Sequence, residues 1–169
     1  MNSSVKDIKR IGVLSIILSV FFFILLAVSV LFIFLIVRAI NKAEGWIVIF
    51  IIIFGIVLIL ILGLVGIISL ILGVLNLSTG ITVMKSSTSI DTIYNRKGRI
   101  KFSIFVLRLT SVVLIIAGIV MILVAIKSSE WMFLVFAGIA ILIGVLSMVL
   151  VNKSVPAFKE IIKMKEEAN

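Results

Sequence analysis

Cysteine and histidine are both absent from the 169 residues, which removes much of the chemistry that small enzymes use. Without them the chain has no disulfide, no thiolate nucleophile, no serine–histidine pair and no thiolate or imidazole ligand for a metal or haem. Acidic residues are scarce, at 7 against 16 lysines and arginines, and none lies within a long apolar run. Carboxylates inside the membrane usually carry coupled protons or pair with cationic substrates. The sequence therefore predicts a protein that is not an enzyme and holds no metal or cofactor.

Apolar residues dominate what remains. They make up 63% of the chain, and the mean hydropathy of +1.48 is far outside the range of soluble domains. Four apolar runs each reach the roughly 20 residues that a helix needs to cross about 30 Å of hydrocarbon. These runs are 11–37, 46–75, 102–126 and 131–151. They do not alternate with polar residues as membrane strands do. We therefore predict an all-α integral membrane protein, with four transmembrane helices in a single domain over 1–169.

In each half of the chain, one short polar segment separates the two spans. "AINKAEGW" covers residues 39–46 and "AIKSSEW" covers 125–131. Each ends in a tryptophan, and an indole ring suits the membrane–water boundary because its N–H can meet water. Trp46 and Trp131 are therefore predicted to be interfacial anchors, and the spans to form two tandem helical hairpins. The hairpins share similar apolar stretches, which a duplication or a chance match in apolar sequence could equally produce.

The second span continues beyond the length that a bilayer requires. Residues 46–84 are nearly uncharged and, as one helix, would reach about 58 Å at 1.5 Å per residue. Such a helix must tilt, bend near the polar group 76–80, or project from the hydrocarbon.

Basic residues gather in three segments that flank the spans. They are Lys6, Lys9 and Arg10; Lys85, Arg96, Lys97, Arg99 and Lys101; and Lys153, Lys159, Lys163 and Lys165. The positive-inside rule then puts both termini, the loop 76–101 and the tail 152–169 in the cytoplasm of a multi-pass plasma-membrane protein. The composition, rich in isoleucine and lysine and free of cysteine, is typical of a prokaryotic membrane protein. The scattered charge, without a nucleic-acid-binding motif, favours anionic lipid headgroups over nucleic acid as a partner.

Five cations are candidate contacts for lipid or for a partner protein. Four close the central loop, and the fifth is the only ionisable residue inside a span. They are Arg96, Lys97, Arg99, Lys101 and Arg108. Arg108 follows Lys101 by seven residues, about 10 Å along a helix, so its side chain could snorkel to the headgroups. The alternative is a buried site, but its helix offers no acidic partner, and we favour snorkelling.

Two segments outside the spans have apolar residues at helical spacing. The loop carries Ile90, Ile93 and Tyr94, and the tail carries Phe158, Ile161 and Ile162. In the tail, Ser154 and Pro156 resemble a helix start, so we predict a short amphipathic C-terminal helix. Both apolar faces would rest on lipid or dock a partner protein.

Small residues recur in the spans, as Gly66, Gly73 and Gly80 every seven residues and as the pair Ala140 and Gly144. They could serve helix packing inside the chain or a homo-oligomer face. The expected function is that of a non-enzymatic membrane protein that interacts with other membrane proteins or lipids, as an accessory or immunity-type subunit. The alternative is a small oligomeric channel, holin-like pore or transporter subunit.

Overall fold

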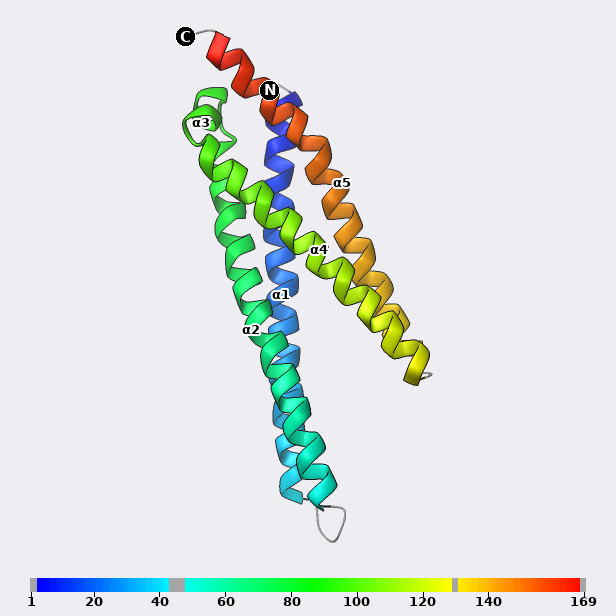
Figure 1. The fold of residues 1–169 in the computed structure, drawn as a ribbon. Coiled ribbons are helices and arrows are strands. Elements are labelled where there is room, and N and C mark those ends of the chain that lie inside the picture. Colours follow the sequence, from blue (N-terminus) through cyan, green and yellow to red (C-terminus); the bar gives the residue numbers. More distant parts are fainter. Residues whose placement is uncertain (1–2, 43–47, 129–130, 168–169) are drawn as a thin grey trace. The chain divides into compact units, whose positions relative to one another are not determined.

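Helices make up almost all of the described chain. The computed structural model describes residues 3–42, 48–128 and 131–167, and these ranges contain no strand (Figure 1). The helices are α1 (Ser3–Lys42), α2 (Val48–Ser86), α3 (Ile90–Asn95), α4 (Lys97–Ser128) and α5 (Trp131–Glu167). All but α3 are long and apolar enough to span a membrane. The prediction of an all-α membrane fold with four spans is confirmed.

The outer surfaces of the long helices are apolar. Phe54, Leu60 and Ile126 are each more than two-thirds exposed within the chain. In water such a surface would aggregate, whereas in lipid it meets acyl chains of the same polarity. Helices suit that setting because each satisfies its own backbone hydrogen bonds. The chain is therefore a multi-pass membrane protein.

The region predicted as a loop, 76–101, is mostly helical. α2 continues without interruption to Ser86, and α4 begins at Lys97. Hydroxyl side chains near the end of α2 donate to carbonyls one turn back, with Thr82 Oγ1 at 2.8 Å from the Ser78 oxygen and Ser86 Oγ at 2.7 Å from the Thr82 oxygen. Their hydrogen bonds thus stay within the helix and do not divert the backbone into a turn.

The tail is helical, but no separate helix begins at Ser154. α5 continues through Pro156 to Glu167. Ser154 Oγ donates to the Leu150 carbonyl at 2.9 Å, one turn back, and so does not act as the N-cap of a new helix. Proline lacks an N–H, so the Asn152 carbonyl loses its usual helical partner at this point. Ser154 and Pro156, which resemble a helix start in the sequence, therefore mark a place where α5 lacks one backbone hydrogen bond but does not end.

Two compact units divide the chain. Unit 1 comprises Met1–Ile16 and Asn76–Asn169, and unit 2 comprises Ile17–Leu75. Unit 1 therefore contains the start of α1, the end of α2, and all of α3, α4 and α5. Unit 2 contains the remaining parts of α1 and α2.

Unit 2 is a helical hairpin that packs through apolar side chains. A Cβ added at Gly73 would lie 3.3 Å from the Phe23 ring, and one at Gly66 would lie 3.4 Å from Leu26 Cδ1. Ser29 is buried, and its hydroxyl donates to the Leu25 carbonyl in its own helix at 2.9 Å.

Unit 1 brings backbones into direct contact. A Cβ added at Gly80 would lie 2.9 Å from the Gly12 carbonyl oxygen, so α1 and α2 touch through their main chains there. α4 and α5 do the same, because a Cβ at Gly144 would lie 2.9 Å from the Ser111 oxygen. Small residues allow this approach. Gly80 and Gly144 therefore pack inside the chain, as do Gly66 and Gly73 in unit 2.

A buried polar cluster joins three helices of unit 1. Asn76 of α2 donates through Nδ2 to Thr110 Oγ1 of α4 at 3.0 Å, and its Oδ1 accepts from Ser15 Oγ of α1 at 3.4 Å. Ser15 Oγ also lies 3.3 Å from Thr79 Oγ1. All four side chains are buried. Residues of the polar group 76–80 thus join three helices.

Candidate functional site

The basic segments meet at one end of unit 1, which we call the basic end. The start of α1, the short α3 and the last turns of α5 lie together there (Figure 1). Lys165 Nζ of α5 lies 2.8 Å from Asp91 Oδ1 of α3, and Lys97 Nζ of α4 lies 3.3 Å from Glu166 Oε1 of α5. Ser154 Oγ of α5 lies 3.4 Å from the Asp7 carbonyl oxygen of α1.

The short helix α3 has clear local signals for its position. Ser89 is its N-cap, and the Ser89 hydroxyl accepts a hydrogen bond from the Thr92 amide at 3.2 Å. Asp91 adds an acidic group in the first turn, where the helix dipole favours it. Arg96 is the C-cap of α3, and its carbonyl accepts from the amides of Arg99 and Ile100 in the first turn of α4. The connection between α3 and α4 is thus a single residue, Arg96.

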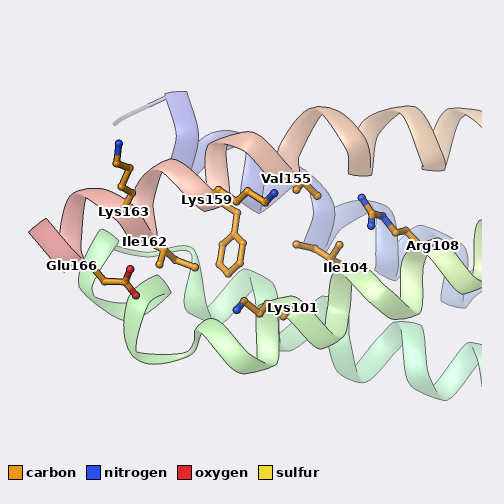
Figure 2. A pocket seen from close by; sticks show the side chains of 9 residues that line it. Lys101, Ile104, Arg108, Val155, Lys159, Ile162, Lys163 and Glu166 are labelled. Atoms are coloured by element: carbon orange, nitrogen blue, oxygen red, sulfur yellow. The ribbon is translucent and has the colours of Figure 1, made fainter.

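A hollow of about 330 Å³ lies between the start of α4 and the end of α5 (Figure 2). Its floor is apolar, and cations with one carboxylate surround it. The lining residues are Lys101, Ile104, Arg108, Val155, Phe158, Lys159, Ile162, Lys163 and Glu166. Figure 2 shows Lys159 reaching from α5 toward Arg108, while the amine of Lys163 points away from the hollow.

The charges around this hollow are only partly compensated. Glu166 is bonded to Lys97, and Lys163 Nζ lies 3.6 Å from Glu167 Oε1. Arg108 donates through Nη2 to Asn152 Oδ1 of α5 at 3.1 Å, which orients the guanidinium without neutralising it. Among the residues that the structure describes, Lys101 and Lys159 make no ion pair. The hollow therefore presents excess positive charge over an apolar floor.

A second hollow, of about 370 Å³, lies between the end of α2 and the start of α4. Its lining is rich in hydroxyl groups and includes Ser78, Thr79, Thr82, Gly98, Arg99, Phe102 and Ser103. Three of its hydroxyls already have partners in the chain: those of Thr79, Thr82 and Ser103 donate to the carbonyls of Asn76, Ser78 and Arg99 at 3.2, 2.8 and 2.9 Å. Arg99 is the one charged residue there, so this hollow is a weaker candidate for an anion.

The structure divides the five predicted contact residues among several places. Lys101 and Arg108 line the α4/α5 hollow, and Arg99 lines the second hollow. Lys97 pairs with Glu166 and lies 4.5 Å from the centre of the Tyr94 ring. Arg96 is exposed at the junction of α3 and α4. Of the predicted anchors, Trp131 is 68% exposed at the first position of α5, while Trp46 lies outside the described residues.

Arg108 is exposed within the chain, and its guanidinium has a defined polar partner in Asn152. The sequence offers Arg108 no acidic partner on its own helix, and the amide that it contacts lies on α5, 44 residues further along the chain. Asn152 and Lys159 lie seven residues apart, which puts them on one face of a helix. Lys101 and Arg108 on the preceding span are also seven residues apart. These matching spacings were the available signal that the two pairs of side chains could meet.

Parts of the two apolar faces that were expected to meet lipid or a partner are inside unit 1, while Ile90, Tyr94 and Ile162 are half-buried. Ile93 of α3 is fully buried, and Phe158 and Ile161 of α5 are 3% and 0% exposed. The expectation failed because it treated loop and tail as separate surface segments. In the structure α3 packs against α5, so neither segment is a separate surface element.

No group of three or more histidine, cysteine, aspartate or glutamate side chains that could hold a metal ion occurs in the described ranges. Comparison of the chain with models of protein families, with curated proteins and with solved structures found no match.

Proposed function

We propose that the chain is a non-enzymatic, multi-pass protein of a prokaryotic cell membrane that acts by binding other membrane proteins or lipids, as an accessory or immunity-type subunit. The observation that supports this most is the convergence of three basic segments at the basic end of unit 1. Their acidic partners there, Asp7, Asp91, Glu166 and Glu167, compensate only part of the charge. An end of this kind attracts anionic headgroups and acidic protein surfaces.

The same convergence supports the proposed orientation. Lysines and arginines near membrane spans favour the cytoplasmic side, and here the start of α1, the region of α3 and the end of α5 carry most of them. We therefore place the basic end in the cytoplasm, with both chain termini. The helix ends that carry Arg38, Lys42 and Lys127 would then lie outside.

Orientation can be tested with single cysteines, since the chain has none of its own. Thr88 is exposed between α2 and α3, whereas the neighbouring Ser87 is 5% exposed and would react poorly. We expect an impermeant maleimide added to intact cells to label Ala43→Cys and Ser129→Cys, which lie in the connections outside the described residues. Thr88→Cys should react only after permeabilisation. Labelling of Thr88→Cys alone in intact cells would overturn the orientation.

Binding can be tested by crosslinking in the membrane with paired charge variants. The double variant Arg96→Gln and Arg99→Gln removes two exposed cations from the basic end, outside the α4/α5 hollow. Arg38→Gln with Lys42→Gln removes two exposed cations elsewhere and serves as the control. We expect only the first pair to reduce crosslinking to other membrane components. A closed ring made of this chain alone, with ion conduction in vesicles, would favour the channel alternative.

A further inference from the structure

The α4/α5 hollow combines an apolar floor with surrounding cations, and a small inorganic anion would use only the cations. Its floor is formed by Ile104, Val155, Phe158 and Ile162, all aliphatic or aromatic. Cations stand around that floor, and the ladder from Lys101 to Arg108 on α4 covers about 10 Å. A matching ligand carries negative charge at one end and hydrocarbon beside it.

The charge balance favours an anion. Lys159 reaches toward Arg108, and Lys101 stands on the facing helix (Figure 2). The single carboxylate in the lining, Glu166, is bonded to Lys97 and so does not oppose an anion with its full charge. Asn152 holds the Arg108 guanidinium at the side of α5. The cations are thus gathered before any ligand arrives, which lowers the cost of ordering them on binding.

The place of the hollow along the helices favours a lipid. It lies where the apolar runs 102–126 and 131–151 meet the basic segments, and this is the depth of phospholipid headgroups in a bilayer. Its volume of about 330 Å³ suits a headgroup with glycerol, and is small for a partner helix about 10–12 Å wide. Basic pockets between transmembrane helices are known to hold anionic headgroups.

We propose that this hollow binds one anionic glycerophospholipid. Its phosphate diester lies between Lys159 and Arg108, within reach of Lys101, and the first carbons of an acyl chain cover Val155 and Ile162, the half-buried members of the floor. This inference rests on the proposed function, because it names lipid as a component bound at the basic end. It assigns the contact to the α4/α5 hollow, whereas Arg96 and Arg99 attract partners from elsewhere on that end.

The test uses the full chain, purified in a neutral detergent and delipidated. Phosphatidylglycerol is titrated against phosphatidylcholine with the same acyl chains, and retained lipid is counted by native mass spectrometry beside the shift in melting temperature. Glycerophosphoglycerol and inorganic phosphate are the chain-free probes. We expect phosphatidylglycerol alone to be retained at one molecule per chain, because the other lipid is neutral overall and the chain-free anions cannot use the apolar floor.

Matched variants locate the site. Lys159→Gln and Arg108→Gln should each weaken phosphatidylglycerol binding roughly fivefold, the effect of one cation near a lipid phosphate. Lys153→Gln removes the same charge from an exposed position of α5 outside the hollow and should leave binding unchanged. Arg108→Lys keeps the charge without the planar fork and should bind nearly normally, which separates loss of charge from loss of folding.

Several results would overturn the inference. They are equal retention of phosphatidylcholine, full effect of inorganic phosphate or glycerophosphoglycerol, or equal weakening by Lys153→Gln. Each would leave the crosslinking and orientation tests of the proposed function intact, since those depend on Arg96, Arg99 and Thr88. Loss of crosslinking specificity with normal phosphatidylglycerol binding would instead reject the broader role and keep the lipid site.

Discussion

Unit 1 and unit 2 pair helices of similar composition in different ways. In unit 2, Gly66 and Gly73 accept the side chains of Leu26 and Phe23, and the hydroxyl of Ser29 stays within its own helix. In unit 1 the backbones themselves touch, and the buried polar cluster connects α1, α2 and α4. Apolar contacts between helices in lipid are non-directional, whereas a buried hydrogen bond has a preferred geometry.

The two units therefore differ in how firmly their contacts position the helices. In unit 2 the contacts at Gly66 and Gly73 are made by flexible side chains, which can adjust by rotating. Unit 1 fixes the positions of α4 and α5, and these are the helices that hold Lys101, Arg108 and Lys159 around one hollow. A binding site needs its supporting residues held in place, and direct backbone contact supplies that constraint.

The largest expected effect compares Gly80→Ala in unit 1 with Gly73→Ala in unit 2. The new Cβ at position 80 would lie 2.9 Å from the Gly12 carbonyl oxygen, and main chains cannot move aside without separating α1 and α2. At position 73 it meets the Phe23 ring at 3.3 Å, and a ring can shift. We expect Gly80→Ala to lower the free energy of unfolding by about 1–3 kcal/mol, the usual cost of overpacking. Gly73→Ala should cost clearly less.

Thermal unfolding in detergent, followed by circular dichroism, measures both variants. Gly63→Ala is the control, because a Cβ there has no atom within 4 Å and the change gains helix propensity. If Gly73→Ala proved more damaging than Gly80→Ala, unit 2 would be the more tightly specified part of the chain, and the comparison would be reversed.

A smaller effect is expected from the buried polar cluster. Asn76→Leu removes the bonds to Thr110 and Ser15, while Thr110→Val removes one partner and keeps the shape of its side chain. Hydrogen bonds between membrane helices average about 0.6 kcal/mol and reach about 1.7 in double-mutant cycles. We therefore expect a coupling energy in that range between positions 76 and 110.

Ser29→Ala in unit 2 is the matched control, because its hydroxyl is bonded only to the Leu25 carbonyl among the hydrogen bonds that the structure describes. It should change stability by less than about 0.5 kcal/mol, since a hydroxyl bonded one turn back contributes little to a helix. A cycle that shows no coupling between Asn76 and Thr110 would mean that close packing alone specifies unit 1.

Sequence reasoning found the spans because they are long and apolar, and a bilayer leaves the backbone few other solutions. It misjudged the ends of the helices. Asn76 and Thr79 looked like a break in the second span, yet their side chains find partners on α1 and α4, which no local pattern reveals. Pro156 likewise looked like a helix start, although α5 continues past it.

Only part of the candidate site could be predicted from the sequence. Lys101 and Arg108 were identified from charge alone, and Lys159 was assigned to a surface helix. Their meeting depends on α5 continuing straight along α4 beyond the apolar run, so that residues more than 50 positions apart line one hollow. Pairing of this kind is tertiary, and it was invisible while the tail was treated as a separate helix.

The smallest expected effect concerns the ion pair between Lys165 of α5 and Asp91 of α3, which asks whether surface charge adds to the rigidity of unit 1. The two groups lie 2.8 Å apart, with 34% and 71% of their side chains exposed. Exposed pairs of this kind contribute about 0.2–1 kcal/mol and are screened by salt.

Asp91→Asn also removes an acidic group from the first turn of α3, so its effect mixes the pair with the helix dipole. Lys165→Met removes the pair alone, and the double variant separates the two contributions. We expect a slight loss of thermal stability in Lys165→Met at low salt that disappears at high salt. The control is Glu167→Gln, which breaks the pair with Lys163 inside α5 and leaves the contact between helices unchanged. A loss that persists at high salt in Lys165→Met, and is absent in Glu167→Gln, would show that the docking of α3 on α5 depends on more than surface charge.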